Sequence, residues 1–196
     1  MKWLARKKKT DEAVLPMLST ERLVLRAFDM NDAVHVYAFA QSDQVGPMAG
    51  FAPHTSLEDS RTMVEKFIES GEVWALVAKN TGRVIGFVSL QKDGRRSIAS
   101  AKRMGYVLGE AFWGQGYATE ACREVLRYAF EELGCEVVSA DHFPFNQKSK
   151  RVIKKLGFTL EGTIRRARPL PDGSVSDLVT YSLLRSEYEA QQKNSK

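Results

Sequence analysis

Two glycines stand directly before a long amphipathic helix, in the segment Trp113-Gly114-Gln115-Gly116. Apolar residues recur at intervals of three and four from Ala118 to Leu133, and the repeat stops at Gly134, which predicts the helix. Glycines let backbone amides turn toward a ligand, and the helix dipole adds about half a positive charge at this end. Spacing alone leaves both a tight turn and an anion-binding loop open. A nucleotide P-loop is excluded because Gly-Lys-Ser/Thr is absent, and a dinucleotide loop because Thr119 occupies the position of the third glycine.

The order of predicted strands and helices favours one mixed α/β or α+β sheet and excludes a doubly wound dinucleotide fold. Seven strands are predicted over residues 21–28, 73–78, 84–90, 104–108, 137–140, 158–166 and 177–184. Four helices are predicted over residues 33–41, 56–71, 118–133 and 147–156. Ser56 and Asp59 form a capping-box pair, and turns at residues 79–83 and 171–173 predict two hairpins.

Composition narrows the class of protein. Of the 196 residues, 43% are hydrophobic and 27% charged, which is typical of a soluble globular chain. The longest apolar run, residues 73–78, is far shorter than the roughly 20 residues of a membrane-spanning helix, and no apolar signal-peptide segment follows Met1. We therefore expect a cytoplasmic protein that does not contact membranes. Cys122 and Cys135 allow at most one disulfide, and the three histidines lack zinc-ligand spacing, so no metal site is expected.

The net charge of +5 originates in the first ten residues, which hold five basic and no acidic side chains. The rest of the chain is neutral. A basic tail can bind nucleic acid or another anionic surface through phosphate contacts. A short solvated terminus without a motif is the simpler interpretation, and we expect a disordered tail over residues 1–15.

The segment Trp113-Gly114-Gln115-Gly116-Tyr117-Ala118-Thr119-Glu120-Ala121 resembles the acyl-CoA pyrophosphate loop of the GNAT acetyltransferases, in particular the RimJ/RimL type that acetylates ribosomal-protein N-termini. Residues 20–26, 104–108, 146–152 and 155–158 resemble the opening strand, fourth strand and final helix of that branch, in the same order. The resemblance implies a single-domain GNAT fold with a mixed, mostly antiparallel seven-stranded sheet, splayed between its fourth and fifth strands and flanked by about four helices. The acetyltransferase domain would span residues 16–190, followed by a polar tail over residues 191–196.

The resemblance implies acetyl-CoA as cosubstrate. Pantetheine would lie along the end of the fourth strand, the pyrophosphate against the amides of the glycine loop, and Arg151 near the 3′-phosphate. The cofactor-binding positions are then Val107, Leu108, Gly114, Gln115, Gly116, Tyr117, Ala118, Thr119, Asn146 and Arg151. From the residues alone, Trp113 is a core side chain, Asn146 a helix N-cap and Ser149 a solvated hydroxyl. The resemblance instead assigns catalytic positions to Asn146, beside the pantetheine arm, and to Ser149, as the acid that protonates the departing thiolate.

No general base is evident. Many GNAT enzymes carry a glutamate on the fourth strand, but the matching stretch here, Ala101-Lys102-Arg103-Met104, offers cations. An α-amine has a pKa of about 8 against about 10.4 for lysine, so an N-terminal substrate is partly uncharged at neutral pH and needs no strong base. Glu120, Asp141 and His142 are the fallback bases, although each has an ordinary structural explanation.

The implied activity is direct transfer of an acetyl group to an amine, most readily the N-terminal α-amine of a protein or peptide, by a monomer or homodimer. The alternatives are acetylation of a small amine (a polyamine, an aminoglycoside or an amino acid) and a non-catalytic acyl-CoA-binding module. Direct transfer needs no cysteine, so we expect Cys122 to be inert packing. The acceptor site is expected at residues 45–54 and 169–176, with Met48, Phe51 and Phe87 in an apolar pocket or in the core.

Overall fold

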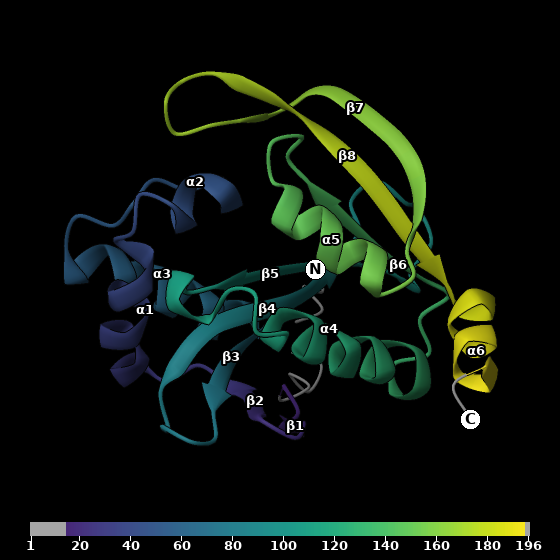
Figure 1. Cartoon of the computed structure of the whole chain (residues 1–196), viewed down its shortest axis with the longest axis horizontal. Helices are drawn as coiled ribbons and strands as arrows, with labels where there is room; N and C mark the ends of the chain where they lie inside the picture. The colour runs from purple at the N-terminus through teal and green to yellow at the C-terminus, as the bar shows by residue number, and fades with distance from the viewer. Residues whose placement is uncertain (1–14, 195–196) are drawn as a thin grey trace, which may run out of the picture.

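A sheet of eight strands forms the centre of the computed structural model, which describes residues 15–194 (Figure 1). Its spatial order is β1-β2-β3-β4-β5-β6-β8-β7. The strands are β1 (Leu18–Ser19), β2 (Leu23–Ala27), β3 (Val73–Ala78), β4 (Val84–Lys92), β5 (Ala101–Leu108), β6 (Val137–His142), β7 (Thr159–Pro169) and β8 (Val175–Leu184). The helices are α1 (Ala33–Ala40), α2 (Val45–Ala49), α3 (Leu57–Ser70), α4 (Tyr117–Arg127), α5 (Gln147–Lys155) and α6 (Arg185–Asn194).

The two faces of the sheet carry different helices. Trp74 and Leu76 of β3 pack in one core with the apolar side of α4, including Val125. Val73 and Ala75, which alternate with them and point the other way, pack in a second core with α1 and α3. The fully apolar sequence of β3 is therefore explained by burial on both faces.

The sheet opens between β5 and β6. Residues 101–103 of β5 pair in parallel with residues 137–139 of β6, and the pairing stops there. On its other side β5 stays paired with β4 as far as Leu108. Beyond Arg103, the edge of β5 that faces β6 is therefore left without ladder partners. The predicted splay between the fourth and fifth strands is confirmed.

The predicted strands are all found, and the structure adds elements whose sequence signals are weak. The pair of residues in β1 is too short to show alternation. The five residues of α2, Val-Gly-Pro-Met-Ala, include two poor helix formers. The added helix α6 follows β8 without a break and extends into the predicted C-terminal tail. The long predicted helix begins at Tyr117 and is α-helical to Arg127, after which residues 128–132 form a π-helical turn.

Two local predictions are confirmed in detail. The Ser56 hydroxyl accepts from the Asp59 N–H and the Asp59 carboxylate accepts from the Ser56 N–H, which completes the capping box of α3. The β7–β8 turn closes through hydrogen bonds between Leu170 and Ser174 and between Gly173 and Leu170. The predicted basic tail at residues 1–15 lies outside the described residues except for Leu15.

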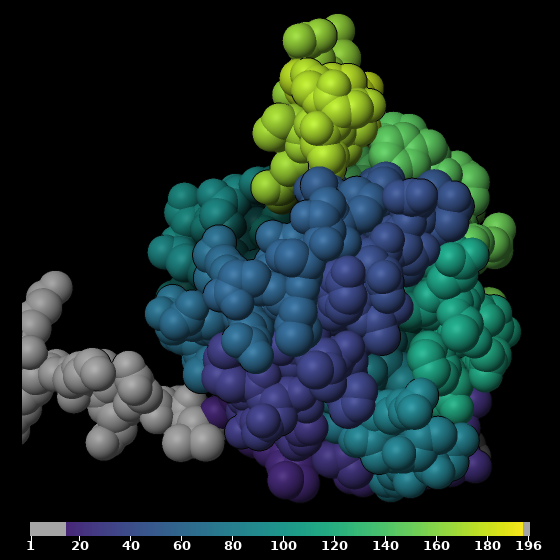
Figure 2. Space-filling model, turned by 90° about the vertical axis from the view of Figure 1, so that its left-hand side faces the viewer, coloured from purple at the N-terminus to yellow at the C-terminus, as the bar shows by residue number. Residues whose placement is uncertain are grey.

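The β7–β8 hairpin extends away from the body and arches above α2 (Figure 1). Figure 2 shows it as the yellow-green arm standing above the blue segments of α1 to α3. Two register shifts bend it, at residues 160–162 and 164–168 of β7. At the second register shift, Arg166 adopts a left-handed φ of 49° and its N–H donates to the Asp177 carboxylate at 2.7 Å.

Within the described part of the chain, no helix has both the length and the apolar character needed to cross a membrane.

Candidate active site

A cavity of about 720 Å³ occupies the gap between β5 and β6. Val107 packs in the core under α1 and α3, and Arg103, four residues earlier on β5, lies on the same face. Tyr106 and Tyr117 pack against the core under α4, on the opposite face. All four residues line the cavity. The groove therefore passes through the sheet and is bordered by the glycine loop and α5 on one face and by α2 and the hairpin on the other.

The glycine loop has a backbone that other residues adopt with strain. Gly114 and Gly116 have φ values of 75° and 86°, and Gly116 is the N-cap of α4. The first amides of α4 point out of the helix end, where they and the helix dipole favour an anion. Trp113 fixes the loop, because its indole N–H donates to the Leu108 carbonyl at 2.8 Å and its ring packs against both cores. Lys148 of α5 stacks over that ring, with its ammonium 3.5 Å from the centroid.

A second set of contacts, which was not predicted from the sequence, holds the glycine loop in place. The Glu120 carboxylate accepts hydrogen bonds from the Thr20 hydroxyl at 2.6 Å and from the Arg22 Nε at 2.7 Å. Arg22 also donates to the Gln115 carbonyl at 3.0 Å and lies over the Tyr117 ring. Partial burial alone would raise the pKa of Glu120, but the donors from Thr20 and Arg22 outweigh it and lower that pKa. Glu120 does not line the groove, so the structure places this fallback base away from the site.

Nearly all of the predicted cofactor positions border the groove. The lining includes Val107, Leu108, Gly114, Gly116, Tyr117, Ala118, Thr119, Asn146 and Arg151. Gln115 does not line it, because its side chain turns back to donate to the Ala111 carbonyl at 2.8 Å. On α5, Lys148, Arg151 and Lys155 share one face and line the groove together.

Ser149 and Tyr106 meet inside the groove. The two hydroxyl oxygens are 2.8 Å apart, and the Tyr106 hydroxyl also lies 3.1 Å from the Ser149 carbonyl. Burial raises the pKa of Tyr106, which keeps its proton at any physiological pH. Asn146 caps α5 by accepting from the Ser149 N–H at 3.0 Å, and its amide donates to the Met48 carbonyl of α2 at 2.9 Å. The predicted N-cap is confirmed, and the same side chain joins the two elements on either side of the groove.

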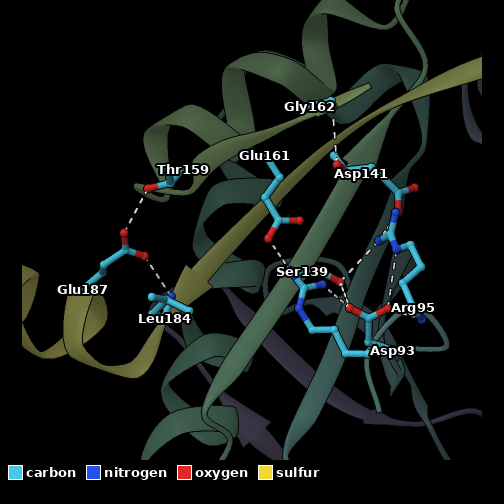
Figure 3. Close-up of polar contacts among 11 residues, drawn as sticks. Asp93, Arg95, Ser139, Asp141, Thr159, Glu161, Gly162, Leu184 and Glu187 are labelled. Carbon is cyan, nitrogen blue, oxygen red and sulfur yellow. Dashed lines mark hydrogen bonds and ion pairs between the residues drawn. The ribbon is translucent and has the colours of Figure 1, made fainter. Parts of the chain in front are cut away.

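The other two fallback bases line the groove but are already engaged. The Asp141 carboxylate forms an ion pair with Arg95 at 2.9 Å, as Figure 3 shows, and lies 3.9 Å from Arg103. His142 is buried, with Nδ1 2.7 Å from the Phe143 carbonyl and Nε2 3.4 Å from the Tyr181 hydroxyl. Asp141 is the only carboxylate among the described residues that border the groove. Residues 15–194 contain no group of three or more His, Cys, Asp or Glu side chains arranged to hold a metal ion.

The groove lining includes part of the segments predicted to form the acceptor site. Met48 and Phe51 line the groove, as does Phe87, which also packs on Phe67 with ring centroids 4.8 Å apart. The hairpin tip at residues 169–176 does not line it. The hairpin instead contributes Arg168 and Leu178, one from each strand below the tip. The acceptor role of residues 169–176 stays a prediction. That the arm meets the groove below its tip had no clear sequence signal, because the bulges of β7 set how far the arm reaches.

Comparison with known proteins agrees with this geometry. The family model for the acetyltransferase (GNAT) domain matches residues 22–159. The chain belongs to the GNAT acetyltransferase family. This acetyltransferase is 29% identical over 180 residues to the uncharacterized N-acetyltransferase YoaA of Bacillus subtilis (strain 168), covering 88% of this chain and 98% of YoaA. It is also 36% identical over 110 residues to YdaF of the same organism, which carries the provisional name ribosomal N-acetyltransferase, covering 56% of this chain and 58% of YdaF.

The fold of the acetyltransferase is also that of a solved structure. A GNAT-family acetyltransferase from Bacillus anthracis superimposes with a TM-score of 0.78 at 24% identity, covering 88% of this chain and all of that one.

The buried cysteines fit direct transfer. Cys122 is fully buried in the core, and burial raises the pKa of its thiol, so this acyltransferase has no thiolate there.

Proposed function

We propose that this acetyltransferase transfers an acetyl group from acetyl-CoA directly to the N-terminal α-amine of a protein or peptide. GNAT acetyltransferases use acetyl-CoA as the donor. The observation that carries the acceptor assignment is the ion pair between Arg95 and Asp141, the one carboxylate among the described residues that line the groove. An α-amine, with a pKa of about 8, supplies enough neutral nucleophile near pH 7 without a strong base, whereas a lysine amine does not. The provisional name of YdaF supports an acceptor of the ribosomal-protein type.

The donor would lie on the face that carries α4 and α5. Its pyrophosphate would accept hydrogen bonds from the amides of residues 114–119, where the glycines permit a close approach. Pantetheine would lie along the unpaired edge of β5 at Val107 and Leu108, and Arg151 would meet the 3′-phosphate. Lys148 and Lys155 border the same stretch of groove and add positive charge for the phosphates.

The transfer step then needs few groups from the protein. The neutral amine nitrogen attacks the thioester carbonyl carbon, an N–C bond forms, and a β5 backbone amide stabilises the oxyanion. As the C–S bond breaks, the Ser149 hydroxyl protonates the thiolate, while the new amide nitrogen releases a proton to water. Solvent returns a proton to the Ser149 oxygen, so the step is balanced. Tyr106 acts as a positioning residue whose hydroxyl oxygen lies 2.8 Å from that of Ser149, and Asn146 positions Ser149 through the start of α5.

Two peptides of equal length test the assignment. One has a free N-terminus and no lysine, and the other has an acetylated N-terminus and one lysine. With acetyl-CoA we expect release of free CoA and a mass increase on the first peptide, at a rate at least about 10-fold above the second. Faster acetylation of the lysine peptide, or of spermidine, would assign the acceptor to another class. Binding of acetyl-CoA without transfer to any amine would favour the non-catalytic module.

A further inference from the structure

Two guanidinium groups line the acceptor side of the groove with little acidic charge to balance them. Arg103 comes from β5 and Arg168 from the hairpin. Arg168 pairs in register with Ser176, two residues from Leu178, so all three share a face of the hairpin. Val179 and Tyr181, which follow Leu178 on β8 and point to the opposite face, pack on the α4 side. Arg168 and Arg103 therefore lie on the same face of the sheet, opposite the glycine loop.

The acidic side chains near this face already form ion pairs with other arginines. Asp93 is buried and accepts from the Ser139 hydroxyl at 2.8 Å (Figure 3). It also pairs with Arg96 at 2.5 Å. Glu161 pairs with Arg96. Asp141 pairs with Arg95 at 2.9 Å, which leaves Arg103 only a 3.9 Å approach to the same carboxylate oxygen.

Arg168 has even less acidic charge near it than Arg103. It is exposed, and within residues 15–194 no acidic group lies within ion-pairing distance of it. The strained Arg166, held by Asp177, lies in the bulge directly before it and fixes the course of the strand. A cationic side chain held at a groove by a bent strand, rather than free on a loop, is suited to bind an anion.

We propose that the acceptor is an amine that also carries an anionic group, a carboxylate, which Arg168 and Arg103 bind on the face opposite the donor. The inference rests on the proposed function and specifies its substrate class. A planar guanidinium pairs with a carboxylate through two parallel hydrogen bonds, which orients the substrate as well as holding it. A polyamine would instead meet two like charges. The carboxylate has two chemical sources, an acidic side chain beside a peptide N-terminus or the α-carboxylate of a free amino acid.

Matched acceptors distinguish these sources. The peptide pair is Ser-Asp-Ala-Ala and Ser-Asn-Ala-Ala, both C-terminally amidated, so that the aspartate is the only anion. The amino-acid pair is L-serine and L-serinamide. Each is measured for binding by calorimetry in the presence of CoA and for acetylation with acetyl-CoA. The variants are R168Q and R103Q, and the matched control is R165Q, an exposed arginine of the same strand that does not line the groove.

We expect the acidic member of one pair to bind and react about 10-fold better than its neutral partner, mainly through KM. R168Q and R103Q should bring that ratio close to one, and R165Q should leave it unchanged. Preference within the peptide pair identifies a protein acceptor, and preference within the serine pair identifies an amino acid. Equal binding and rates within both pairs, or loss of both members alike in R168Q, would overturn the inference while leaving acetyl transfer established. Arg168-dependent binding without any CoA release would retain the anion site and reject the proposed function.

Discussion

Ser149 is held at the groove by three separate contacts. Its N–H is capped by Asn146, its hydroxyl meets that of Tyr106, and its carbonyl lies near the same tyrosine. A side chain fixed in this way loses little entropy on ligand binding, so its hydroxyl would already be oriented for the proposed proton transfer.

Ser149→Ala tests this role. We expect kcat to fall by about 100-fold, since general acids contribute factors of that order, while acetyl-CoA affinity stays within a few-fold. Steady-state kinetics and calorimetric titration with acetyl-CoA measure the two effects. Lys150→Ala, one position along α5 and outside the groove lining, is the control and should leave kcat unchanged. An unaltered kcat in Ser149→Ala would remove the serine from the mechanism.

Asp93 gives a pH-dependent prediction about stability. Burial alone would raise the pKa of Asp93, but hydrogen bonds from the Arg95 N–H, Ser139 and Arg96 outweigh it and lower that pKa. A carboxyl with a lowered folded pKa stabilises the fold above its unfolded pKa of about 3.9, and this contribution is lost as the pH falls through the folded value.

We therefore expect Asp93→Asn to lower the free energy of unfolding by about 2 kcal/mol at pH 7 and by progressively less below pH about 4. Urea unfolding at a series of pH values measures the difference. Asp43→Asn, at an exposed aspartate, is the control and should change stability little. A deficit that is the same at pH 3 and pH 7 would contradict the charge-based explanation.

The role of a residue was predictable from the sequence where it depends on residues a few positions away in the chain. Asn146 and Ser149 are three residues apart at a helix start, which the sequence shows directly. Tyr106 and Arg168 were missed as site residues for a physical reason. Tyr106 meets Ser149 across 43 positions of chain, and Arg168 reaches the groove only because β7 is bulged. Neither contact produces a local pattern.

The glycine loop and α4 act as one element, because the loop backbone sets where the first amides of the helix point. Gly114 and Gly82 provide a matched pair. Their φ values are 75° and 68°, and an added Cβ would meet nothing within 4 Å at either position. Alanine should therefore cost about 1 kcal/mol of stability through backbone strain at both sites.

Only Gly114→Ala should weaken donor binding, by about 10-fold, because it moves the amides proposed to bind the pyrophosphate. Gly82→Ala, in the turn between β3 and β4, should bind acetyl-CoA like the unaltered protein. Thermal unfolding checks the shared cost and calorimetry the difference in affinity. Equal affinity in the two variants would mean that the loop is only a tight turn.

Elements with strong local signals were predicted well, and those held by distant contacts were not. The capping box and apolar stripe of α3 are present in the sequence itself. In contrast, α2 contains Gly46 and Pro47, and its Met48 carbonyl is held by Asn146, 98 positions away. The π-helical turn after Arg127 is likewise invisible in the apolar repeat, which continues through it.

Acetyl-CoA should stabilise the entire fold, because the proposed donor site spans the glycine loop, β5 and α5. A ligand at about 100 times its dissociation constant adds about 2.7 kcal/mol. For a chain of this length the unfolding midpoint should rise by about 5–10 °C. ATP and NADH at equal concentration are the controls and should give smaller shifts. Stabilisation by a control nucleotide but not by acetyl-CoA would contradict the donor assignment.

Two strand pairings, β3 with β4 and β7 with β8, were predictable because a turn in the sequence joins each pair. The splay followed from the family resemblance rather than from residue patterns, since β5 and β6 are separately ordinary strands. The path of the hairpin arm depends on the two register shifts of β7. Those shifts were not predictable from the sequence.

The gap between β5 and β6 also separates the part of the protein that would recognise the donor from the part that would recognise the acceptor, which matters for redesign. Recognition of the donor would depend on the glycine loop and α5, and recognition of the acceptor on α2 and the β7–β8 arm, which share few residues. Transplanting the arm of another family member onto this scaffold should then change which amine is acetylated and leave donor affinity intact. The opening in the sheet is thus a boundary along which the two specificities can be redesigned one at a time.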